Sequence, residues 1–165
     1  MRVRDIQALY DYHYWANGRI LDTATRITAE QFAAPAPVPS GSLRGTLIHT
    51  LGAERSWLAR WEGRPLAPRA QDDESATVAS LAALWRETET ALRAYLASLE
   101  DEALDRELRY TRSGGQTLTK PLWQTLVHVV NHGTQHRSEA AMLLTIYGAS
   151  PGDLDFSLWS SDLAS

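Results

Sequence analysis

Three of the five histidines in this chain follow one another at four-residue steps, at His128, His132 and His136. In an α-helix, a four-residue step turns the side chain by about 40°, so neighbouring members of the series share one face. Two imidazoles at this spacing can bind one metal ion, as they do in many helical zinc sites. The spacing alone permits either the first two or the last two as a pair, and a pair is too few for a metal site.

His49 is the natural third ligand, because it is the only histidine in the middle of another predicted helix. On a helical wheel it lies nearly opposite the leucine stripe of that helix. Its neighbours on that side are small: Gly45, Gly52, Ala53 and Ser56. The position fits an exposed histidine on a polar face, and it also fits a histidine that reaches a metal from a cleft lined by small side chains.

Four further polar residues could support or compete with this site. Glu139 is the only acid on the histidine face of its helix, three residues after His136, and could orient that ligand or act as a catalytic base. A solvated surface acid is the alternative. Arg137 could bind a carboxylate of a substrate, or form an ion pair between helices. Glu54 lies on the leucine side of its helix and predicts a structural hydrogen bond, and His13 is expected at the surface or at an interface.

The elements that must carry these residues are four long helices. Apolar residues recur at three- and four-residue steps over residues 6–27, 43–61 and 78–99, and a segment that is apolar on most sides runs from Pro121 to Gly148. Ser42 is a good N-cap for the second helix, and Thr28 with Gln31 forms a capping-box pattern for a short turn of helix.

A change of period interrupts the helical pattern before the last helix. Between residues 106 and 119 the apolar residues alternate with a period of two around the turn sequence SGGQ at 113–116. We therefore expect an all-α fold: a four-helix bundle with long crossover connections and a short β-hairpin between the third and fourth helices. Residues 1–165 are expected to form a single domain.

Composition narrows the classes of function. The chain has no cysteine, which excludes disulfides, thiolate metal sites and a cysteine nucleophile, so a metal must be held by histidine and carboxylate. The formal net charge is −4 with both signs scattered, which disfavours nucleic acid as a partner. No stretch approaches the roughly 18 apolar residues of a membrane span. We expect a cytoplasmic protein that acts on a small-molecule substrate, with no nucleic-acid or membrane partner.

Four motifs along the chain carry a family resemblance. They are YWAN at residues 14–17, the segment from Ser42 to His49, NHGTQHR at residues 131–137 and PGDLDF at residues 151–156. In this order, over nearly the whole chain, they resemble the DinB family of damage-inducible four-helix-bundle proteins. The NHxxxHR element together with an upstream histidine on the second helix is the more specific part of the resemblance.

The resemblance implies a single divalent metal ion bound by His49, His132 and His136, with His128 as a non-ligand one turn earlier. Three neutral imidazoles make an open site, in which water or an incoming ligand takes the remaining position. Zinc is the default metal for such ligands, and nickel or iron also suit them. Because members of the family are often homodimers, we expect a homodimer.

The resemblance also implies a class of reaction. Related proteins use a low-molecular-weight thiol such as bacillithiol or mycothiol, with its sulfur at the metal. The expected function is therefore a metal-dependent thiol S-transferase that acts on electrophiles. A metal-dependent hydrolase is the first alternative, with hydroxide in the open position and Glu139 as the base. A non-catalytic, stress-related bundle that binds a metal or a small ligand is the second.

Overall fold

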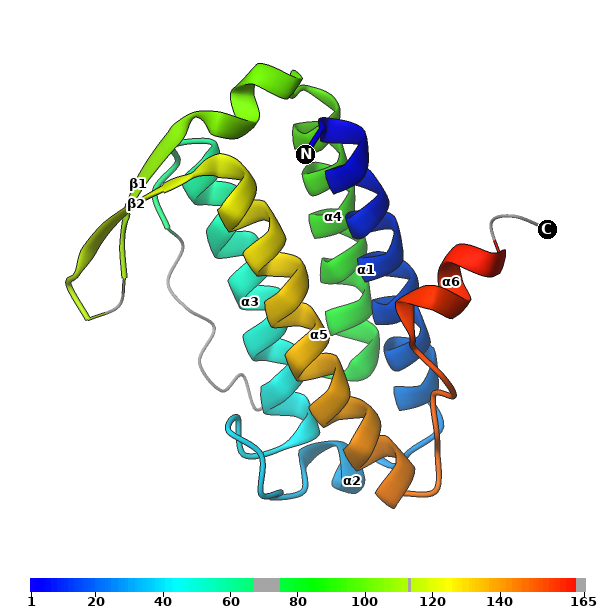
Figure 1. The fold of residues 1–165 in the computed structure, drawn as a ribbon. Coiled ribbons are helices and arrows are strands. Elements are labelled where there is room, and N and C mark those ends of the chain that lie inside the picture. The colour runs from blue at the N-terminus through cyan, green and yellow to red at the C-terminus, as the bar shows by residue number, and fades with distance from the viewer. Residues whose placement is uncertain (67–74, 113, 163–165) are drawn as a thin grey trace.

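Four long helices lie side by side in the computed structural model, which describes residues 1–66, 75–112 and 114–162 (Figure 1). They are α1 (Val3–Ala24), α3 (Leu43–Trp61), α4 (Val78–Ala97) and α5 (Leu122–Ile146). Helices α1 and α3 each contact both α4 and α5. The expected four-helix bundle is confirmed, and α5 packs against the two helices that carry the other candidate site residues.

The core is built from the apolar faces of these helices. Among its fully buried side chains are Ile6, Leu43, Leu92, Leu126 and Leu144, which come from all four long helices. Burial of side chains of this size stabilises a fold by roughly 1.5–3 kcal/mol each. The stripes that the sequence predicts are therefore the surfaces that hold the bundle together.

Local capping signals place two helix starts where the sequence predicts them. The Ser42 hydroxyl accepts a hydrogen bond from the Gly45 amide at the start of α3. Thr28 and Gln31 form the expected reciprocal capping box at the start of the short helix α2 (Ala29–Ala33). These caps satisfy amide groups that have no partner inside the helix.

The predicted hairpin is present between α4 and α5. Strand β1 (Glu107–Thr111) pairs antiparallel with β2 (Thr117–Pro121), and the register places Tyr110 opposite Leu118. The hairpin lies beside the end of the bundle at which α5 begins (Figure 1). Gly115 in the turn has φ +80°, a conformation that side chains disfavour.

Two short elements were not predicted from the sequence. A 3₁₀ helix, η1 (Asp101–Asp105), precedes the hairpin, and α6 (Phe156–Asp162) packs against α1 near the end of the chain. None of the helices in the described residues combines the length and the apolar character that a membrane span needs.

Candidate metal centre

Three histidines from two helices converge at one point between α3 and α5. His49 Nε2 lies 3.1 Å from His132 Nε2, and His136 Nε2 lies 3.2 Å from the same atom. All three ligand atoms lie within 4.8 Å of one another. The structure therefore brings together the three residues that the resemblance implied as ligands, and leaves His128 outside the group.

Two of the three spacings between the ligand nitrogens are close to those around a metal ion. Zinc–nitrogen bonds of about 2.0–2.1 Å in a tetrahedral arrangement place neighbouring ligand atoms about 3.3–3.4 Å apart. The two observed distances, 3.1 and 3.2 Å, differ from this by a few tenths of an ångström. The third pair of ligand atoms, on His49 and His136, lies within 4.8 Å.

Glu139 determines which nitrogen of His136 carries the proton. The Glu139 carboxylate lies 2.8 Å from His136 Nδ1, one turn along α5. A carboxylate only accepts hydrogen bonds, so Nδ1 is the protonated nitrogen and donates to it. In the neutral ring, Nε2 then presents its lone pair to the other two histidines. This carboxylate–histidine pair is the arrangement that orients histidine ligands of metals.

The environment of His132 also favours the form that binds metal. Burial, followed by the neighbouring His136 and His49, lowers the pKa of His132 from its ordinary 6.5 to about 4. The ring is therefore neutral throughout the physiological range of pH. A metal entering the cluster does not have to displace a proton from it.

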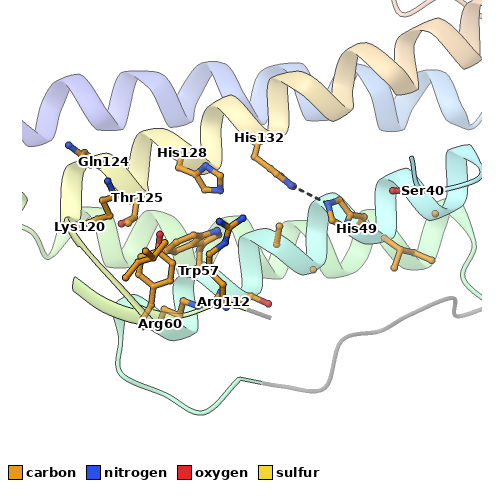
Figure 2. A pocket seen from close by; sticks show the side chains of 17 residues that line it. Ser40, His49, Trp57, Arg60, Arg112, Lys120, Gln124, Thr125, His128 and His132 are labelled. Atoms are coloured by element: carbon orange, nitrogen blue, oxygen red, sulfur yellow. Dashed lines mark hydrogen bonds between the residues drawn. The ribbon is translucent and has the colours of Figure 1, made fainter. Parts of the chain in front are cut away.

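The cluster opens into a pocket of about 870 Å³ between α3, α5 and the hairpin (Figure 2). His49 and His132 line it and point toward one another, while His128 and Trp57 lie further along the wall. The small residues Gly45, Gly52, Ala53 and Ser56 also line it, as the cleft hypothesis for His49 required. The three convergent imidazoles therefore lie beside a pocket that is large enough for a small molecule.

A second polar cluster lies inside the bundle, centred on Glu54. This residue is 1% exposed, and its carboxylate accepts hydrogen bonds from four donors. The donors are His13 Nε2, the Tyr14 hydroxyl, Asn17 Nδ2 and Trp85 Nε1. The structural hydrogen bond predicted for Glu54 is confirmed. The surface or interface position expected for His13 is wrong, since that side chain has no exposed area.

Arg137 completes this buried network from α5. Its guanidinium donates to His13 Nδ1 at 2.8 Å and to the Asn17 side-chain oxygen at 2.9 Å. Because a guanidinium cannot accept, His13 Nδ1 carries no proton and the ring donates from Nε2 to Glu54. A neutral imidazole thus links a buried cation to a buried anion. This placement favours the interhelical alternative for Arg137 over contact with a substrate, because Arg137 is not among the residues that line the pocket.

Gly133 permits the close approach of α1 to α5 at this network. A Cβ atom there would lie 2.8 Å from His13 Nδ1, closer still to His13 Cε1, and 2.9 Å from Arg137 Nη1. A side chain at this position would therefore displace the imidazole or the guanidinium. The sequence carries no local signal for this, because the contact joins residues on different helices.

Comparisons with known proteins identify the family and support the fold. A model of the DinB family matches residues 1–162. The chain is 24% identical over 156 residues to Protein DinB of Bacillus subtilis (strain 168), and the match covers 92% of this chain and 91% of that one. A crystal structure described as the conserved protein of locus from Enterococcus faecalis superposes with a TM-score of 0.62 at 15% identity. That match covers 86% of this chain and 95% of the other, and it supports the fold.

Proposed function

The chain belongs to the DinB family, and we propose that it is a metal-dependent enzyme that transfers a low-molecular-weight thiol to an electrophile. The observation that carries the proposal is the convergence of His49, His132 and His136 at the wall of an open pocket. Zinc is the proposed metal, because imidazole nitrogen is a common zinc ligand and the spacing fits its bond lengths.

A three-histidine site leaves a coordination position for a substrate. A metal held by His49, His132 and His136 would lower the pKa of a thiol in this position, so that the thiol is present as thiolate at neutral pH after its proton passes to solvent water. The thiolate forms a carbon–sulfur bond with the electrophile, whose leaving group departs with the bonding electrons. The chain has no cysteine of its own, so the thiol must come from outside, as bacillithiol or mycothiol would.

The placement of Glu139 favours thiol transfer over hydrolysis. A hydrolase needs a base beside the open position, whereas this carboxylate accepts from His136 Nδ1, on the side of the ring away from the cluster. Among the described residues that line the pocket, none is acidic. We therefore propose Glu139 as a positioning residue, which holds His136 in the tautomer that can bind metal.

The test combines metal content with turnover. Elemental mass spectrometry on untagged protein should find about one metal ion per chain, lost in His49→Ala and retained in His128→Ala, the matched pocket histidine. With chlorodinitrobenzene as electrophile and bacillithiol, mycothiol or glutathione as thiol, the parent and His128→Ala should release chloride and His49→Ala should not.

Each outcome separates the candidate functions. Turnover of ester substrates without added thiol would replace the transferase by the hydrolase. Metal binding with no turnover in either assay would favour the non-catalytic binding protein. A parent protein that takes up neither zinc nor nickel would overturn the metal-site proposal itself.

A further inference from the structure

The pocket that holds the histidine cluster has a second, cationic part. Arg60 comes from the end of α3, Arg112 follows β1 and Lys120 lies on β2, and all three line the same pocket as His49. Figure 2 shows Arg60 and Arg112 close to Trp57, on the side of the pocket toward the hairpin. Neither the metal site nor the buried network uses these cations.

The geometry of the hairpin explains why two of the cations face the pocket. Side chains alternate between the two faces of a strand, so residues two apart share a face. Tyr110 and Arg112 lie on one face of β1 and its continuation. Leu118 and Lys120 lie on the same face of the hairpin, because Leu118 pairs directly with Tyr110. All four line the pocket, whereas Arg109, which precedes Tyr110 on β1 and therefore points to the other face, does not.

The third cation is held over an aromatic ring. The Arg60 guanidinium lies 5.0 Å from the centre of the Trp57 ring, and the Tyr110 ring packs edge-on against the same tryptophan at 4.9 Å. This arrangement gives the pocket an aromatic wall beside its positive charge. None of the described residues that line the pocket is acidic, so no carboxylate in that lining neutralises Arg112 or Lys120.

We propose that this pocket binds a small anionic molecule, whose carboxylate, sulfonate or phosphate group lies among Arg60, Arg112 and Lys120. Its body packs on Trp57 and extends toward the histidine cluster. The volume of about 870 Å³ is within the range of small-molecule sites. If the protein is the proposed enzyme, this anion is its substrate. That the anion is a substrate rests on the proposed function, whereas its binding in the pocket does not.

The test uses a charged probe and its neutral twin on protein freed of metal with a chelator. Cinnamate and cinnamamide share an aromatic ring and nearly the same shape, and differ in the negative charge. Heteronuclear NMR titration gives both affinities and identifies the amides that shift. We expect cinnamate to bind about tenfold more tightly than the amide, with shifts at Trp57, Arg60 and the hairpin.

Variants that remove one positive charge inside or outside the pocket test where the anion binds. Arg112→Gln and Lys120→Gln should each weaken cinnamate by about threefold and leave cinnamamide unchanged, because the two cations share the tenfold advantage of the charged probe. Arg109→Gln removes the same charge from the same strand outside the pocket and should leave both affinities unchanged. The replaced side chains are exposed, so the fold should tolerate all three changes.

The possible results are decisive. Equal affinity for the two probes, no binding of cinnamate, or an equal loss in Arg109→Gln would overturn the anion site. Metal content, measured in the same variants, should stay at the parent level, because none of them touches the histidine cluster. A protein that binds cinnamate as expected but takes up no metal would contradict the proposed function and leave the anion site standing.

Discussion

Replacing Gly133 by alanine should destabilise the protein, although the same replacement inside a helix ordinarily stabilises it. Alanine has a higher helix propensity than glycine by about 1 kcal/mol. At Gly133, however, the new Cβ would lie 2.8 Å from His13 Nδ1 and 2.9 Å from Arg137 Nη1. Neither group can move without losing a buried hydrogen bond to the other or to Glu54.

The size of the effect follows from these opposing contributions. Overpacking a well-packed interior costs about 1–3 kcal/mol, and a lost hydrogen bond to a charged group costs about 1.5–3 kcal/mol. After the gain in helix propensity is subtracted, the free energy of unfolding should fall by about 1.5–5 kcal/mol. For a chain of this length, that lowers Tm by roughly 10 °C.

Gly18→Ala is the matched control, because Gly18 also lies inside a long helix, α1, and a Cβ there meets nothing within 4 Å. This variant should gain up to about 1 kcal/mol. Urea and thermal unfolding followed by circular dichroism measure both changes. If Gly133→Ala were as stable as Gly18→Ala, the contact between His13 and α5 would not constrain the bundle, and the reasoning would be refuted.

Three further changes test the two polar clusters. His132→Ala should abolish metal uptake and His128→Ala should keep it, as measured by elemental mass spectrometry. If His128→Ala lost the metal and His132→Ala kept it, the assignment of the ligands would be wrong. Glu54→Gln should lower the free energy of unfolding by about 3–5 kcal/mol in urea, since Arg137 loses its compensating charge, whereas the exposed Glu87→Gln should change it by less than about 0.5 kcal/mol. The pKa of His132 is about 4 in the folded protein and 6.5 or so unfolded, so the unfolded chain binds more protons between these values. Metal-free protein should therefore lose stability as pH falls from about 6.5 to 4, with a shallower dependence in His132→Ala.

Signals close together in the sequence predicted the fold well. The cap at Ser42, the hairpin turn and the three- and four-residue apolar steps each depend on neighbours in the chain, and the structure has the expected elements there. Helix α6 was missed because its support is tertiary: Phe156 and Trp159 pack edge-on against Tyr12.

In the site too, contacts between residues close in sequence could be predicted, whereas contacts between distant residues could not. The contact between Glu139 and His136 spans three residues of one helix, and the sequence offered it as an alternative. The position of His13 depends instead on Glu54 and Arg137, which are 41 and 124 residues away. A buried histidine with partners so distant looks like a surface histidine until the helices are assembled. The choice between His128 and His136 as ligands likewise came from the family resemblance, because the four-residue spacing permits both.

The orientation of α5 about its axis places side chains in both the buried network and the histidine cluster. His136 and Arg137 are adjacent, so their side chains leave the helix about 100° apart. One reaches the cluster and the other reaches His13 and Asn17 inside the bundle. A rotation of α5 that moved His132 and His136 away from His49 on α3 would also withdraw the Arg137 guanidinium from its buried acceptors. Glu54 would then be left uncompensated, at a cost of several kcal/mol. The internal network therefore holds the histidines of α5 in the orientation that a three-ligand site requires.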